Sequence, residues 1–98
     1  MINKLEPIHP GEILLEEFIK PLGMNMNRLA TELHVPANRI TQIVSGERCI
    51  TAETALRLAR YFDTTPEFWM NLQARHDLEV ARDESEERIA FEVHRLTA

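Results

Sequence analysis

The fold is decided by residues 26–46, which read Met-Asn-Arg-Leu-Ala-Thr-Glu-Leu-His-Val-Pro-Ala-Asn-Arg-Ile-Thr-Gln-Ile-Val-Ser-Gly. The apolar residues form two groups at the spacing of one helical face: Met26, Leu29, Ala30 and Leu33, then Ile40, Ile43 and Val44. Only His34, Val35 and Pro36 separate the first predicted helix from the second, which covers residues 37–45, and this loop is too short for antiparallel helices. A turn of three or four residues between two short helices is the helix-turn-helix unit.

The turn residues fit this geometry, with one departure. Pro36 cannot continue the first helix because it lacks an N–H group, and it suits the start of the second. Gly46 follows the second helix where a left-handed cap is expected. His34 stands where glycine often supplies a positive φ, and histidine is among the residues enriched in that region. The geometry of the turn therefore depends on whether His34 adopts the left-handed conformation or avoids it.

The composition describes one small folded domain. The chain has 98 residues, of which 44% are hydrophobic and 28% charged. No apolar run approaches the roughly 18 residues of a membrane span, and the N-terminus lacks a cationic and apolar leader. Cys49 is the single cysteine, which excludes an internal disulfide framework. These features predict a cytoplasmic protein with no membrane contact.

The charge is distributed unevenly along the chain. The formal net charge is −5, which is unfavourable for a nucleic-acid binder. Residues 24–62, however, carry five arginines against three acids, whereas residues 76–98 carry seven acids against three arginines. Attraction to phosphate depends on charge within a Debye length of about 8–10 Å, so the positive segment can still bind DNA. The acidic segment is either a solvated face or a surface for a basic protein.

Three further helices are predicted around the central unit. The first begins at His9 with Pro10 in its first turn, and it places Leu14, Phe18 and Leu22 on one face. Thr51 is expected to cap the second of them, and either Thr64 or Thr65 is expected to cap the third. The fifth helix is expected to end near residue 82. Its tryptophan, Trp69, is interpreted as a buried anchor in preference to a partner-binding one.

The last segment changes character after residue 82. Residues 83–87 are a polar, acidic link, and Ile89, Phe91 and Val93 then alternate with other residues. A period of two favours a short strand over a short helix. A lone strand would pair with a second copy or with a partner. The predicted division is therefore a helix-turn-helix domain over residues 1–82 and an acidic extension over residues 83–98.

The outward side of the predicted second helix of the unit carries side chains that suit the edges of DNA bases. They are Ala37, Asn38, Thr41, Gln42 and Ser45. Asn and Gln amides bond bidentately to adenine, and Thr and Ala methyl groups contact thymine. Arg39 lies beside this side, and Arg28 and Arg48 flank the unit, where they suit phosphates or guanine. Asn27 begins the first helix of the pair, where backbone N–H groups bind a phosphate.

Metal binding and catalysis find no support in the residue spacing. The candidate ligands are His9, His34, Cys49, His76 and His94. No two of them show the close spacings typical of zinc sites. No nucleophile motif surrounds Cys49, and Glu16 and Glu17 point apart on a helix. The sequence therefore predicts no enzyme, no metal and no cofactor.

Several segments, in order and spacing, resemble the HigA-type antitoxins (also called VapI) of the Xre, or Cro/C1-type, helix-turn-helix superfamily. The most specific of them is Pro66-Glu-Phe-Trp-Met-Asn-Leu-Gln73, and the first is His9-Pro-Gly-Glu-Ile-Leu14. The resemblance covers about residues 7–82. It implies an all-α, five-helix, lambda-repressor-like fold and a bacterial type II toxin–antitoxin module. The chain would be a homodimer that binds palindromic operator DNA, represses its own operon and neutralises a RelE-like mRNA endonuclease toxin, HigB.

Two other interpretations remain open at this point. One is a stand-alone Xre-family regulator without a toxin, because some members of the family have none beside them. The other is a protein-interaction module whose helix-turn-helix no longer binds DNA. The dimer interface is expected over residues 88–96, with the fifth helix as the second choice.

Overall fold

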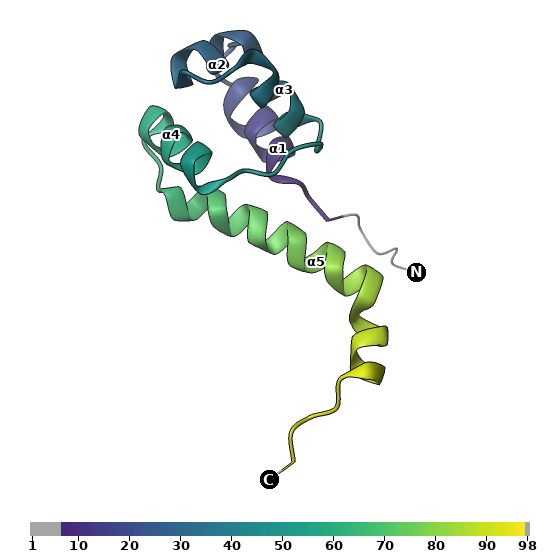
Figure 1. The fold of residues 1–98 in the computed structure, drawn as a ribbon. Coiled ribbons are helices and arrows are strands. Elements are labelled where there is room, and N and C mark those ends of the chain that lie inside the picture. Colours follow the sequence, from purple (N-terminus) through teal and green to yellow (C-terminus); the bar gives the residue numbers. More distant parts are fainter. Residues whose placement is uncertain (1–6, 98) are drawn as a thin grey trace.

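The computed structural model describes residues 7–97 and is helical throughout its body (Figure 1). The elements follow the order α1 (Pro10–Ile13), η1 (Leu14–Ile19), α2 (Met26–Leu33), α3 (Ala37–Val44), α4 (Ala52–Phe62) and α5 (Pro66–Glu92). Because η1 continues α1 without a break, the described chain folds as five helical segments. The predicted all-α, five-helix class is confirmed.

The core is sealed by apolar side chains from every helix. The largest fully buried side chains are Trp69, Leu14, Leu29, Ile40, Ile43, Ile50 and Leu58. The ring of Trp69 lies 4.9 Å from that of Phe18, measured between ring centroids, and its Nε1–H donates to Thr64 Oγ1 at 2.8 Å. Trp69 is therefore a buried anchor, as predicted. The hydroxyl of Thr64 accepts the hydrogen bond from the indole, so Thr65 is the residue that caps α5. Its Oγ1 accepts from the N–H of Phe68.

The turn between α2 and α3 closes on a left-handed residue. His34 has φ 59° and ψ 46°. Its N–H donates to Thr31 O at 3.1 Å, and the N–H of Val35 donates to Ala30 O at 3.0 Å. These paired bonds form a Schellman motif, which satisfies carbonyl groups at the end of α2. His34 thus adopts the conformation that glycine supplies more easily.

Replacing His34 by glycine should stabilise the fold. An L-residue in the left-handed region costs roughly 1–2 kcal/mol, and glycine lacks this penalty. His34 is exposed, so His34→Ala is a matched control that keeps the strain and loses little packing. We expect the His34→Gly variant to exceed the His34→Ala variant by about 1 kcal/mol in free energy of unfolding, measured in urea. Equal stabilities would show that the turn is unstrained.

The first helix differs from its predicted form. In η1 the N–H of Lys20 donates to Leu15 O at 2.9 Å, a π-helical i→i+5 bond. The wider turn brings Leu14 and Ile19, five residues apart, into the same core. Leu22, which the α-helical stripe would have buried, is 63% exposed. Placing Leu22 on the buried face was therefore wrong.

The C-terminal segment is also helical, because α5 continues to Glu92. The predicted end near residue 82 and the predicted strand over residues 89–93 were both wrong. Glu, Arg and Ala are strong helix formers, and five alternating residues are too few to outweigh them. Exposed pairs at i, i+4 spacing add support: Arg75–Glu79, Arg82–Glu86 and Arg88–Glu92.

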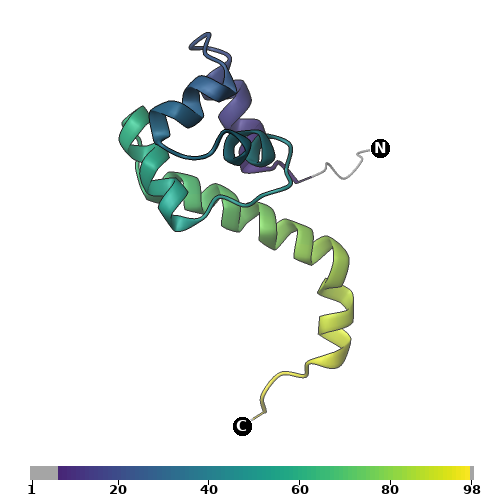
Figure 2. The same ribbon diagram turned by 45° about the horizontal axis from the view of Figure 1, so that its top comes forward.

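The second half of α5 projects beyond the other helices and curves toward its end (Figure 2). The predicted boundary between residues 82 and 83 therefore falls inside a continuous helix. Residues 1–6 and 98 of the two predicted domains lie outside the described residues. The division itself stays a prediction. Within residues 7–97, no helix has the length and apolar character needed to cross a membrane.

Candidate nucleic-acid interface

Helix α3 has one sealed side and one open polar side. Ile40 and Ile43 are fully buried, whereas Asn38 and Thr41 are exposed. Ala37 and Ser45 are also exposed, and Gln42 is half-buried. Thr41 Oγ1 donates to Asn38 O at 3.1 Å, and Ser45 donates in the same way to Gln42 O. The open side therefore presents the free amide of Asn38. It also presents the hydroxyl oxygens of Thr41 and Ser45, whose O–H groups already donate to main-chain oxygens.

Gln42 and Arg48 form a unit at the end of this side. The side-chain oxygen of Gln42 accepts from Arg48 Nε at 2.9 Å. The main-chain oxygen of Gln42 accepts from the N–H groups of Glu47, at 2.8 Å, and of Arg48, at 3.2 Å. Arg48 is exposed, so its remaining guanidinium donors face solvent beside α3. Spacing along the sequence did not indicate that these two candidates are bonded to each other.

The N-terminus of α2 supplies the second group of candidates. Asn25 caps the helix by accepting from the N–H of Arg28 at 2.7 Å. Asn27 and Arg28 are both exposed next to this positive end of the helix dipole. The Arg28–Glu32 pair is 4.0 Å apart and exposed, so it holds the guanidinium only weakly.

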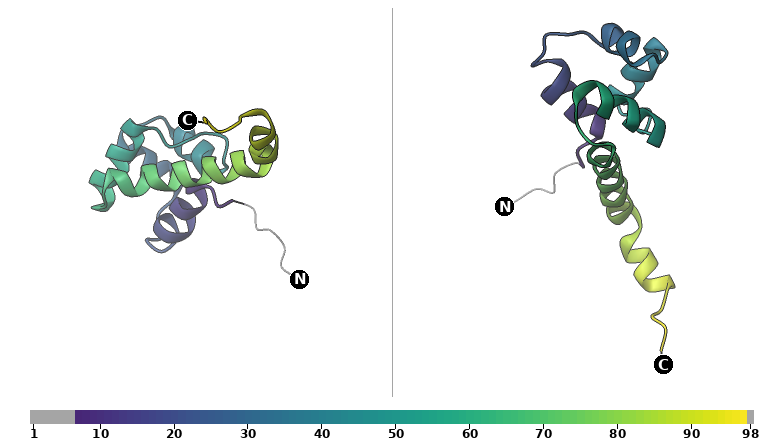
Figure 3. Two further views of the ribbon diagram at one scale, coloured as in Figure 1. Left: turned by 90° about the horizontal axis from the view of Figure 1, so that it is seen from below. Right: turned by 90° about the vertical axis from the view of Figure 1, so that its left-hand side faces the viewer.

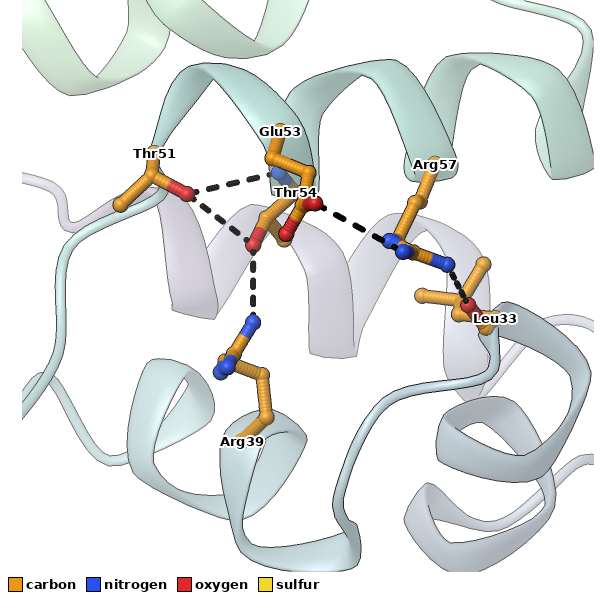
Figure 4. A network of polar contacts seen from close by, with 6 residues as sticks. All are labelled: Leu33, Arg39, Thr51, Glu53, Thr54 and Arg57. Atoms are coloured by element: carbon orange, nitrogen blue, oxygen red, sulfur yellow. Dashed lines mark hydrogen bonds and ion pairs between the residues drawn. The ribbon is translucent and has the colours of Figure 1, made fainter.

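Arg39 lies apart from the other candidates. It is half-buried, and its Nη1 donates to Thr54 Oγ1 of α4 at 3.5 Å (Figure 4). The side chain thus joins α3 to α4 instead of extending from the open side. Its predicted contact with phosphate stays untested.

Comparison with known proteins places this arrangement in a family. The helix-turn-helix family model matches residues 15–69. Virulence-associated protein I of Dichelobacter nodosus is 48% identical over 84 residues, which cover 86% of this chain and 78% of the relative. An addiction module antidote protein of the HigA family from Coxiella burnetii shares 51% identity and superposes with a TM-score of 0.89, covering 94% of this chain and all of the other. The chain belongs to the HigA-like helix-turn-helix family.

A second solved HigA-like structure was determined in the presence of promoter DNA. It is the Pseudomonas aeruginosa antitoxin HigA with the higBA promoter, 43% identical, with a TM-score of 0.90 over 93% of this chain and 99% of that chain. The resemblance recognised from sequence is thereby confirmed at the level of family and fold.

In this HigA-like chain, α4 braces the helix-turn-helix through Arg57. Arg57 Nη1 donates to Leu33 O, at the end of α2, at 2.9 Å, and Nη2 lies 3.7 Å from Glu53 (Figure 4). Thr54, which accepts a hydrogen bond from Arg39, is also hydrogen-bonded to the capping residue Thr51. The sequence contained no signal for the contacts of Arg57, so this role was missed.

A buried amide fixes the segment that follows α3. Gln73 is 5% exposed, and its Oε1 accepts from the N–H of Ile50 at 2.7 Å. Its Nε2 donates to Asp77 at 2.9 Å. A buried N–H without a partner would cost about 1–3 kcal/mol, so Gln73 holds the path from α3 to α4. The signal in the sequence was a polar residue one turn from Trp69, within the segment that carried the family resemblance.

His9 caps α1 in a form that requires a neutral ring. Its Nδ1 accepts from the N–H of Gly11 at 2.9 Å. The His76 ring stands edge-on at 4.8 Å between centroids, and Asp77 lies 3.3 Å from His76 Nδ1. Burial, helped by the charge of His76 and opposed by Asp77, lowers the pKa of His9 from its ordinary value of 6.5. No group of three possible metal ligands occurs among residues 7–97.

This cap predicts a pH-dependent stability. The folded chain binds fewer protons at His9 than the unfolded chain does between the lowered pKa and about 6.5. The contribution of His9 to stability is therefore complete above about pH 6.5 and is lost as the pH falls through the lowered pKa. His9→Asn keeps an acceptor for Gly11 but does not titrate, so its urea midpoint should fall less on acidification. An identical pH profile for both proteins would contradict this role.

Proposed function

We propose that the chain binds operator DNA as a homodimer, represses its own operon and neutralises a HigB-like toxin. One observation carries the DNA-binding part: α3 exposes amides and hydroxyls on the side opposite the sealed Ile40 and Ile43. The HigA structure solved with its promoter supports the same proposal, because it shares this fold. A single unit of this size reads a half-site, and a dimer places two recognition helices about one helical turn apart.

The proposed base readers are Asn38, Thr41 and Gln42, with Ala37 and Ser45 beside them. The Asn38 side chain has no hydrogen-bond partner among the described residues, so its amide is free to meet an adenine edge. Gln42 keeps its amide N–H₂ group for bases while its oxygen accepts from Arg48. The methyl groups of Thr41 and Ala37 suit a thymine methyl.

The proposed phosphate contacts lie on both sides of α3. Arg28 and Asn27 stand at the N-terminus of α2, where backbone N–H groups and the dipole favour an anion. Arg48 stands at the far end, positioned by Gln42. Such contacts fix the register on DNA without reading sequence. Arg39 was expected to join this group, but its bond to Thr54 makes it the weakest candidate.

Two alanine variants separate reading from positioning. Asn38→Ala should reduce the preference for the operator over random DNA by about 1–3 kcal/mol, the value of one bidentate contact. Arg28→Ala should weaken binding to both DNAs alike and reduce the salt slope by about 1. Fluorescence anisotropy with the region upstream of the gene and with scrambled DNA measures both effects. Equal losses on both DNAs for Asn38→Ala would exclude base reading by this residue.

The toxin part rests on family membership and on charge. Residues 76–98 carry seven acids against three arginines, and an RNase requires a cationic surface for RNA. The first test is whether a reading frame for a small basic RelE-like protein abuts the gene. The second is whether cells that express that protein grow again when this chain is expressed with it. Operator binding without rescue would identify a stand-alone regulator. Rescue without operator binding would identify an interaction module.

A further inference from the structure

The side chain of His9 contacts three elements that are distant in sequence. Its Nδ1 accepts from the N–H of Gly11 at the start of α1. Its ring stands edge-on to that of His76 on α5, at 4.8 Å between centroids, and Figure 3 shows the start of α1 beside the first half of α5. A Cβ added at Gly46 would lie 3.9 Å from Cγ and Cδ2 of His9, so the ring also lies against the loop that follows α3, residues 45–51. His9 therefore joins α1 and α5 to the end of α3.

This loop is held near both of its ends. Near its start, Gly46 lies against the ring of His9. Near its end, the N–H of Ile50 donates to Gln73 Oε1 of α5 at 2.7 Å. Arg48, which is proposed to contact a phosphate, lies between these two attachments. The position of its guanidinium therefore depends on both of them.

The two attachments are connected through α5. Gln73 Nε2 donates to Asp77 Oδ1 at 2.9 Å. The same carboxylate oxygen lies 3.3 Å from Nδ1 of His76, whose side chain is 19% exposed. His76 in turn packs against His9. A change at either histidine is thereby transmitted to the residues that hold the loop.

A proton on His9 is incompatible with these contacts. The imidazolium ion carries an N–H at both nitrogens, so its Nδ1–H would face the N–H of Gly11. A cation is also unfavourable at the N-terminus of a helix. Burial and the charge of His76 lower the pKa of His9, and Asp77 opposes them. The closed arrangement is therefore that of the neutral ring.

The charged groups that act on His9, among residues 7–97, are His76 and Asp77. The remaining ionisable residues close in sequence to its contacts are exposed or paired with each other. They are Glu12 on α1, Glu47, Arg48 and Cys49 on the loop, and the pair Arg75–Glu79 on α5.

We propose that His9 and His76 are a proton-sensitive pair that positions α3 and the following loop for operator binding. The inference rests on the proposed operator binding and adds its regulation by pH. A proton on His9 breaks the cap and releases Gly46, so only molecules with a neutral ring hold the loop as the operator requires. The apparent affinity is reduced by that fraction. It therefore falls as the pH falls through the lowered pKa of His9, by at most about tenfold per pH unit.

Simple charge effects have the opposite sign. A protonated histidine adds positive charge, which strengthens attraction to phosphate. A chain in which no histidine positions the loop should therefore bind DNA more tightly on acidification. A loss of affinity is the signature of the pair.

The test is fluorescence anisotropy with the region upstream of the gene, at constant ionic strength, between about pH 7.5 and about pH 5.5, where histidine titrates. The wild-type chain should lose affinity over this range. His9→Asn keeps an acceptor for Gly11 without titrating, so its affinity should not fall. The matched control is His34→Asn, which removes an exposed histidine and tolerates the left-handed conformation, and it should keep the wild-type profile. Emission from the buried Trp69 should stay constant, which separates this loss from unfolding.

Two substitutions on α5 should move the profile in opposite directions. His76→Gln removes a charge that lowers the pKa of His9, so the loss of affinity should begin at a higher pH. Asp77→Asn removes the charge that raises this pKa and keeps an acceptor for Gln73, so the loss should begin at a lower pH. If these residues were merely structural, each substitution would change the affinity at every pH and leave the midpoint in place.

The other outcomes distinguish this inference from the proposed function. Wild-type affinity that is constant or rises on acidification would overturn the pair and leave operator binding intact. A His9→Asn variant with the wild-type profile would do the same. A wild-type chain that fails to bind the upstream region at any pH in this range would overturn both.

Discussion

Gly11→Ala should destabilise the fold by about 3 kcal/mol or more, at the upper end of overpacking effects. A Cβ added at Gly11 would lie 1.8 Å from Ile43 O and 2.6 Å from Ile43 C. These are backbone atoms of α3, so no side-chain rotation relieves the collision. The start of α1 would have to move away from α3. The same variant should therefore lose operator binding.

Gly23→Ala is the matched control for this change. Gly23 has φ +65° and no neighbouring heavy atom within 4 Å of the added Cβ. Its cost is the left-handed backbone alone, roughly 1–2 kcal/mol. Urea denaturation of both variants measures the difference. If the two variants were equally stable, the contact between α1 and α3 would be looser than described.

Local rules predicted the parts of the fold that depend on neighbours in sequence. The caps formed by His9 and Thr51 followed from their positions before helical stripes, and the structure confirms both. The position of His34 in the turn left open whether it adopts the left-handed conformation or avoids it, and the structure shows that it adopts this conformation, with φ 59°. Gly11 could be interpreted only as part of a helix start. Its contact with Ile43 depends on packing between distant segments, which no local pattern contains.

The errors have the same origin at a different scale. The alternation around Ile89 covers five residues, whereas α5 extends over 27 residues. The long helix therefore determines that the segment around Ile89 is helical. The π-helical turn at Leu14 to Ile19 depends on how the first helix meets the core. At both places two local conformations were possible, and the structure around the segment selected one of them.

The candidate interface was predictable where helix periodicity alone fixes direction. Asn38 and Thr41 lie opposite the buried isoleucines, and both are exposed as expected. Arg39 sits at the border of the two faces, so its direction depends on the hydroxyl of Thr54, fifteen residues away. The bond from Arg48 to Gln42 likewise depends on the path of the loop after α3.

Trp69→Ala should cost about 3–5 kcal/mol of stability, as expected for a fully buried large aromatic side chain. The indole is 0% exposed and packs against Phe18 and Phe68, each at 4.9 Å between centroids. Small domains have about 5–15 kcal/mol in total, so this loss is a large share of the stability of the fold. Because Trp69 holds α5 in place, the adjacent hydrogen bond that the N–H of Ile50 donates to Gln73 should fail with it.

Two variants separate the contributions of Trp69. Trp69→Phe keeps a ring in the core but removes the donor to Thr64, and it should cost about 1–3 kcal/mol. Phe68→Ala changes the neighbouring ring, which is 37% exposed, and should cost clearly less than Trp69→Ala. Circular dichroism in urea ranks the three variants. If Phe68→Ala were as damaging as Trp69→Ala, the aromatic cluster as a whole, not the indole, would be the anchor that holds α5 against the helix-turn-helix.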